Sequence, residues 1–187
     1  MKSAIKITAA NEQIEKAMQM LEGIPGGAEK ALSLAINRTL DSAKTEAVRA
    51  VSDEYTIKQK NVRPTLRVKK SNASNLEAEI ISEGSDINLM EFKVSPRTDT
   101  TGNKRRPIRV QVKKGGGGTL TRAFVWNGNV FERDGNTRLP ISRLFGPAAP
   151  VMLNNEQVVE RVQKKAVETV EKRLDHEVGR MLDKAVK

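Results

Sequence analysis

Apolar residues recur at helical spacing along two long stretches of the chain, and these stretches most strongly limit what it can fold into. The first runs from Ala28 to about Glu54 and contains Leu32, Ile36, Leu40, Ala43, Ala47 and Val51. The second follows Asn154 or Asn155, either of which suits a helix N-cap, and contains Val159, Val162, Ala166, Val170, Leu174, Val178 and Met181. At about 1.5 Å per residue the stripes predict helices roughly 40 and 45 Å long. Each helix must bury one face against another element.

The apolar pattern changes to alternation between the two predicted helices. The alternating residues are Leu66, Val68, Leu76, Ala78, Ile80, Phe92, Val94, Ile108, Val110, Val112, Phe124 and Trp126. This pattern predicts an antiparallel sheet with one solvent-exposed face. Asn127-Gly128 predicts a tight hairpin turn, and the proline-rich stretch 139–150 predicts a packed connector that continues neither a strand nor a helix. The predicted fold class is α+β: an antiparallel sheet with long helices packed on one face and an extended loop or hairpin arm.

Shorter elements are predicted in the N-terminal third. Residues 4–8 suit a strand with Ile5 and Ile7 on one face, and Asn11 suits the cap of a helix that ends at the glycines of 23–27. Thr56 and Gln59 have the spacing of a capping box, which predicts a short helix that stops before Pro64. We therefore divide the chain into an N-terminal strand and helix segment, 1–27, whose role is open, and a single α+β domain, 28–187.

Composition points to an elongated or oligomeric protein with an anionic partner. Hydrophobic residues are 37% of the 187 residues and aromatic residues 3%, below the apolar share of an ordinary globular domain. The net charge of +10 favours contact with nucleic acid or an acidic protein surface. Met1–Ala10 lacks the apolar core of a signal peptide, and no stretch is apolar enough to span a bilayer. We therefore expect a cytoplasmic protein with no membrane partner.

Residues with catalytic chemistry are sparse. The only histidine, His176, lies between two acidic residues and suits the exposed face of the last helix. The chain has no cysteine, so thiolate metal sites are excluded, and carboxylate pairs such as Asp53 and Glu54 or Glu77 and Glu79 suit a solvated surface. We predict that the protein is not an enzyme and holds no metal or cofactor.

A run of glycines, Gly115, Gly116, Gly117 and Gly118, invites comparison with a phosphate-binding loop. In such a loop a lysine follows the glycines and a helix begins, whereas here Lys113 and Lys114 precede the glycines and a strand is expected to follow. We therefore reject the nucleotide-binding interpretation. The glycines instead suit a mobile hairpin tip or a loop in close contact with another subunit.

The strongest charge feature is a basic run that only Asp99 opposes. It contains Lys93, Arg97, Lys104, Arg105, Arg106, Arg109, Lys113 and Lys114. Such a run often marks a solvated face, but this one brackets a polar loop, 95–103, that has little to bury. We interpret it as an arm between two strands that contacts DNA or an acidic partner. Phe92 is better placed in the core than against a base, so the predicted contact is with phosphates, without sequence preference.

Five short segments occur in the order typical of a phage family: residues 35–40, 92–96, 110–118, 144–148 and 174–179. Over about residues 28–182 the chain resembles the prophage minor tail protein Z family. The resemblance implies a non-enzymatic tail-completion protein of long-tailed bacteriophages, added at the head-proximal end of the tail. It also implies a sixfold ring around the DNA channel, with the tail terminator and the head-tail connector as partners. The protein would be assembled in the bacterial host cytoplasm and reside in the virion.

One alternative function comes from a different class of protein. The net charge of +10 also suits a free, sequence-independent nucleic-acid-binding protein. A free binder should bind nucleic acid as an isolated chain with a steep salt dependence, whereas a protein of the phage neck should assemble on tails.

Overall fold

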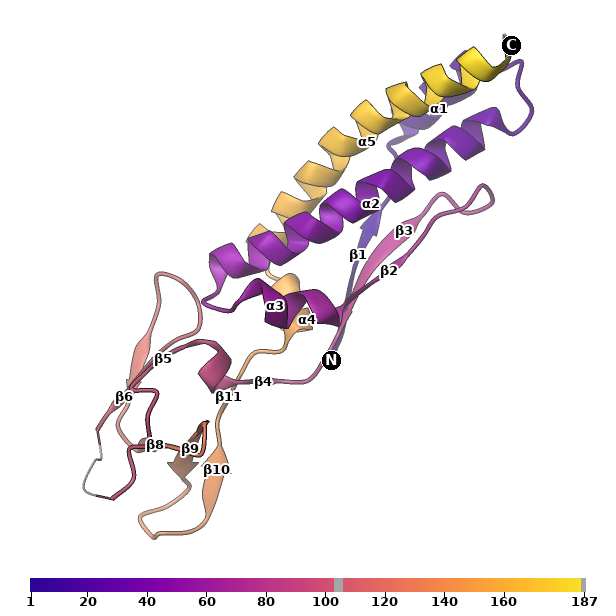
Figure 1. The fold of residues 1–187 in the computed structure, drawn as a ribbon. Coiled ribbons are helices and arrows are strands. Elements are labelled where there is room, and N and C mark those ends of the chain that lie inside the picture. Colours follow the sequence, from indigo (N-terminus) through magenta and orange to yellow (C-terminus); the bar gives the residue numbers. More distant parts are fainter. Residues whose placement is uncertain (103–105, 186–187) are drawn as a thin grey trace.

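The computed structural model describes residues 1–102 and 106–185, which form an elongated molecule with two different ends (Figure 1). One end is built from the long helices α2 (Gly27–Glu54) and α5 (Glu156–Ala185). The other end consists of short strands between residues 87 and 146. The fold is therefore α+β, as the sequence predicts.

Helices α2 and α5 lie side by side along most of their lengths (Figure 1). Their boundaries agree with the two predicted stripes, and many of the buried residues of α2 are small, such as Ala35, Ala43 and Ala47. Asn155 is the N-cap of α5, because its Oδ1 accepts a hydrogen bond of 3.1 Å from the Gln157 amide. The predicted caps therefore include the correct one.

A three-stranded antiparallel sheet packs against α2. Its strand order is β1 (Lys2–Ile7), β3 (Ala78–Glu83), β2 (Leu66–Lys69). Ile5 and Ile80 are paired and buried. Ion pairs join β1 to β3 and to the residue before it: Lys2 pairs with Glu83 at 3.1 Å, and Lys6 pairs with Glu77 at 2.9 Å. The alternation of buried and charged residues predicted this one-sided sheet.

Residues 1–27 pack into the same body as the residues that follow them. Strand β1 completes the sheet, and helix α1 (Asn11–Met20) lies against both α2 and α5. Lys16 forms an ion pair of 2.9 Å with Asp175 of α5. The predicted N-cap is wrong by one residue, because Asn11 is the first helical residue. Ala10 is the N-cap residue, and its backbone amide donates to the Gln13 side-chain oxygen at 3.1 Å.

Two short segments differ from their predicted form. Helix α3 (Gln59–Val62) is preceded by Lys58 rather than capped by Thr56, because the Thr56 hydroxyl donates to the Gln111 carbonyl. The predicted connector 139–150 contains strands β10 (Ile141–Arg143) and β11 (Phe145–Gly146) and starts helix α4 (Ala149–Leu153). Its prolines lie beside the strands or in the first helical turn, where a missing amide costs no hydrogen bond.

The β end consists of small antiparallel sheets rather than the single sheet that the alternation suggested. One has the order β5 (Lys93–Ser95), β6 (Ile108–Gln111), β7 (Gly118–Leu120). Another has the order β10, β9 (Asn129–Arg133), β8 (Ala123–Trp126), and β11 pairs with β4 (Ile87–Asn88). These strands are two to five residues long, too short to form one continuous ladder. The predicted turn at Asn127-Gly128 joins β8 to β9, with both residues at positive φ.

Buried side chains of the β end continue the core of the helical end. Phe92, Ile108 and Val125 belong to the same cluster as the residues between α2 and α5. The alternation predicted that Phe124 and Trp126 of β8 face the core, and this is wrong: Ala123 and Val125 are buried, and Trp126 is 50% exposed. No helix within 1–102 or 106–185 is both long and apolar enough to cross a bilayer.

Candidate nucleic-acid and partner interface

Positive charge is concentrated in the β end. Residues 87–147 contain 12 Lys and Arg against 4 Asp and Glu, whereas the remaining residues contain 21 against 19. Of the net charge of +10, the β end therefore carries +8. The same 61 residues contain all four phenylalanines and the tryptophan. An anionic or aromatic-binding partner would thus meet this end of the molecule.

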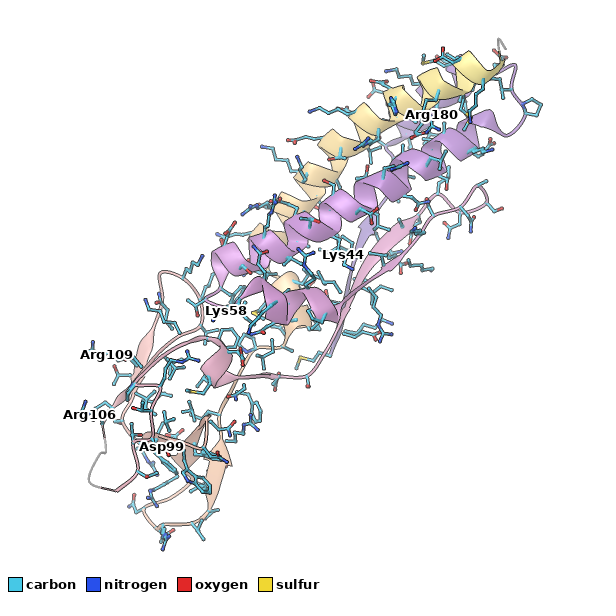
Figure 2. All side chains as sticks on the ribbon, in the orientation of Figure 1. Lys44, Lys58, Asp99, Arg106, Arg109 and Arg180 are labelled. Carbon is cyan, nitrogen blue, oxygen red and sulfur yellow. The ribbon has the colours of Figure 1, made fainter. Side chains whose placement is uncertain are left out.

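Two of the predicted contact residues lie on one exposed sheet face. In the β5–β6 ladder Lys93 pairs with Gln111, and Ser95 pairs with Arg109, so the two cations are diagonal neighbours. Arg106 and Arg109 lie at the same outer edge of the β end (Figure 2). The remaining residues of the predicted arm, Lys104 and Arg105, lie outside the described residues.

The C-terminal end of α2 holds the other two lysines in place. The Lys114 amide donates to the Glu54 carbonyl at 2.8 Å, and the Lys113 ammonium lies 3.8 Å from the Glu54 carboxylate. The Thr56 amide in turn donates to the Val112 carbonyl at 2.9 Å. These contacts join the segment that follows β6 to the end of α2, and they leave the Lys114 side chain exposed.

Arg97 does not project into solvent as the predicted arm requires. Its guanidinium folds back and donates to the carbonyls of Met90, at 2.6 Å, and Phe92, at 3.2 Å. Backbone carbonyls without strand partners attract such a donor. Arg97 therefore stabilises the turn around β5, and the prediction that it belongs to an extended arm is wrong.

The first half of the polar loop is also anchored. Thr100 is 2% exposed, and it exchanges hydrogen bonds with Val125 of β8: its amide donates to the Val125 carbonyl, and its hydroxyl accepts from the Val125 amide at 2.8 Å. Asp99 accepts from the Asn127 amide at 3.1 Å. The prediction that this loop has little to bury is wrong at Thr100, because its backbone amide and side-chain hydroxyl bind the backbone of β8 in the place of a neighbouring strand.

The glycine loop is a hairpin between β6 and β7. Gly115 has a φ of +81°, and the Gly116 amide donates to the Lys113 carbonyl at 3.2 Å. A Cβ on Gly117 would lie 3.3 Å from the Val110 carbonyl oxygen. A strand follows the glycines, as expected, rather than the helix of a phosphate-binding loop. The role of Gly115–Gly118 at a subunit interface stays a prediction.

Sequence reasoning missed an aromatic face on the β8–β9–β10 sheet. Phe131 lies at the centre, with ring centroids 5.9 Å from Phe124 and 5.8 Å from Trp126. Arg133 stacks over Phe124 at 5.5 Å, and Arg143 stacks over Phe145 at 4.9 Å. The Asn127-Gly128 turn was the available signal, because a two-residue turn fixes the register that places Phe124 opposite Phe131.

The residues weighed as catalytic candidates lie apart from this end or in ion pairs. His176 is exposed on α5. The Arg161 guanidinium of α5 donates to the carboxylates of Asp53 and Glu46 in α2. These two hydrogen bonds, of which the one to Asp53 has the larger effect, raise the pKa of Arg161. Within 1–102 and 106–185, no group of three or more acidic or histidine side chains is placed to hold a metal ion.

A long helical body that carries a basic, aromatic-rich end is suited to bind other macromolecules, which is the class of a structural assembly protein. The comparisons with known proteins make this class specific. The family model of prophage minor tail protein Z (GPZ) matches residues 12–187, and the chain belongs to this family of phage tail structural proteins. The match begins within α1 and so includes residues before the segment 28–182 that resembles the family. No curated protein and no solved structure matches the chain.

Proposed function

We propose that the protein completes the head-proximal end of the phage tail and helps join the tail to the head around the DNA channel. Membership of the minor tail protein Z family over residues 12–187 carries this proposal. The role requires binding to several partners in a fixed order and no substrate turnover. The partners are the tail terminator on one side and the head-tail connector on the other.

A ring of six copies is the proposed assembly. An elongated subunit with long rigid helices can span from one ring to the next, and closed rings are the usual form of such repeated contacts. We assign the hairpin Gly115–Gly118 to the boundary between neighbouring subunits, because it is exposed and its backbone is accessible at close range. The net charge of the β end supports a position near the DNA channel.

The aromatic face on β8–β9–β10 supports a protein contact. Trp126 on this face is 50% exposed and packs against Phe131, and Phe145 of the following strand β11, over which Arg143 of β10 stacks, is 48% exposed. Tryptophan and arginine dominate the binding energy of protein interfaces, and solvent-exposed aromatic rings favour burial against a partner. We assign this face to the adjoining tail or neck protein.

The proposal is tested by complementation in an extract. Cells producing a phage that lacks this gene should accumulate filled heads and unjoined tails, and adding the purified protein should restore joined particles. Trp126→Ala with Phe145→Ala should reduce joining at least tenfold with little change in melting temperature. The control Val167→Ala removes a side chain that is 57% exposed on α5, and it should join normally.

The alternative, a free sequence-independent nucleic-acid-binding protein, gives a different outcome in the same assay. A free binder would leave joining unaffected when the gene is absent. Normal numbers of joined, infectious particles without the protein would therefore contradict the proposed function and favour the alternative.

A further inference from the structure

Two adjoining hollows lie where the β5–β6–β7 sheet meets the C-terminal end of α2. The first, of about 530 Å³, is lined by Lys93, Ser95, Arg109, Thr119 and the glycine hairpin. The second, of about 490 Å³, is lined by Ser52, Thr56 and Lys114 with buried Tyr55 and Ile57. Lys93 and Gln111 line both hollows, so the two hollows share a wall, and together they are called the groove.

The side chains that line the groove carry positive charge without any carboxylate. Lys93, Arg109 and Lys114 form no ion pair within the described part of the chain, whereas Glu54, at the end of α2, forms an ion pair with Lys113. Among the other polar lining groups, the hydroxyls of Ser95 and Thr119, the Gln111 side-chain amide and the glycine backbone can donate hydrogen bonds, whereas the Thr56 hydroxyl already donates to the Gln111 carbonyl. These are the groups that proteins use to bind phosphate oxygens.

The floor of the groove is held in place before any ligand binds. The Lys93 amide donates to the Thr56 hydroxyl at 3.1 Å, and that hydroxyl donates to the Gln111 carbonyl. The ladder between β5 and β6 fixes Lys93 diagonal to Arg109. The backbone that carries these cations is therefore fixed, and binding of an anion has to order only their side chains.

The shape and lining select the ligand class. Both hollows are open to solvent, whereas small-molecule sites enclose most of their ligand. No exposed aromatic side chain lines the groove, so it offers neither the apolar centre of a protein interface nor a platform for base stacking. We propose that the groove binds the phosphates of a nucleic-acid backbone, independently of sequence. The inference rests on the proposed function only for the source of the DNA, the genome that passes through the tail.

The groove is tested by binding of a fluorescent 20-base-pair DNA to the full-length protein, measured by anisotropy at several salt concentrations. A triple variant, Lys93→Gln, Arg109→Gln and Lys114→Gln, removes the three cations. The matched control removes three exposed cations from α5, Lys164→Gln, Lys172→Gln and Arg173→Gln, and has the same net charge. Melting temperatures verify that both variants fold.

The slope of log affinity against log salt should become shallower by about 3 in the groove variant and by less than about 1 in the control, because each phosphate contact contributes about 0.9. Two unrelated DNA sequences should bind equally. Equal slopes in the groove variant and the control would overturn the proposal, as would binding to polyglutamate but not to DNA, which would indicate an acidic protein partner. Tail joining is measured separately. If the parent protein binds DNA with the expected salt dependence but tails join to heads without it, the proposed function is contradicted while the proposal for the groove stands.

Discussion

Gly146 of β11 lies directly against the ring of Phe92, and a Cβ at position 146 would overlap three ring carbons. Phe92 is 1% exposed and connects the β end to the common core. Gly146→Ala should therefore lower the free energy of unfolding by about 2 kcal/mol or more, because a packed ring must move. Gly179→Ala is the control, since a Cβ there meets open space within α5, and it should raise stability by about 0.5 to 1 kcal/mol. Equal effects of the two substitutions in urea unfolding would contradict this packing.

The contact between α2 and α5 should provide a large share of the stability. Leu174 is 3% exposed on the buried side of α5, and Leu174→Ala should cost about 2 to 5 kcal/mol. Val167→Ala on the exposed side of the same helix should change stability by less than about 0.5 kcal/mol. Deleting α5 from Gln157 onward should abolish cooperative unfolding. A soluble truncated chain with an unchanged melting temperature would show that α5 is dispensable for the fold.

The hydroxyl of Ser52 is buried in α2 and has no hydrogen-bond partner in the described part of the chain. Ser52→Ala should raise the free energy of unfolding by about 1 kcal/mol, because it removes a polar group that folding leaves unpaired. Ser33→Ala on the same helix removes a hydroxyl that contacts the Ser71 hydroxyl at 3.3 Å, and it should lower stability by a similar amount. Thermal unfolding of both variants measures the difference, and a destabilised Ser52→Ala would mean that the hydroxyl has a partner.

The exposed pair Lys6–Glu77 should add a small acid-sensitive contribution. A hydrogen bond from the Lys6 ammonium lowers the pKa of the Glu77 carboxyl, and the same contact raises the pKa of Lys6. A lowered carboxyl pKa stabilises the fold above the unfolded value of about 4.3, and the effect is lost as pH falls through the folded pKa. The raised Lys6 pKa contributes below about pH 10.4 and is lost as pH rises through the folded value.

Glu77→Gln should therefore lower the melting temperature slightly near about pH 7, and the difference from the parent should vanish near about pH 3. Glu22→Gln changes an exposed carboxylate without an ion pair among the described residues and should have no such pH-dependent difference. A deficit in Glu77→Gln that persists unchanged at the acid end would exclude this pair as its source.

The long elements were predictable because their patterns repeat. The stripes of α2 and α5 continue for seven or more turns, so single exceptions do not obscure the helical period, and Asn155 marked the start of α5. The turn at Asn127-Gly128 was predictable because only a few residue pairs adopt positive φ readily. The short strands of the β end were recognised as strands but not assigned to their sheets.

The site was predicted in composition and only partly in geometry. The basic run identified Lys93, Arg109 and Lys114, but periodicity does not reveal that Arg97 binds backbone carbonyls or that Thr100 is buried. Those contacts depend on which backbone groups lack strand partners after folding, and this is a tertiary property. The facing of β8 was misassigned because large aromatic residues were expected inside, whereas Ala123 and Val125 fill the narrow space there.

The position of the protein in the virion tests the central claim most directly. A gold-labelled antibody against a tag at the C-terminus should be imaged on purified tails and on complete particles. The account predicts label at the head-proximal tip of free tails and at the head-tail junction of complete particles, with none along the tube. Label at the distal tip, or distributed along the tube, would contradict a role in completing the tail and joining it to the head.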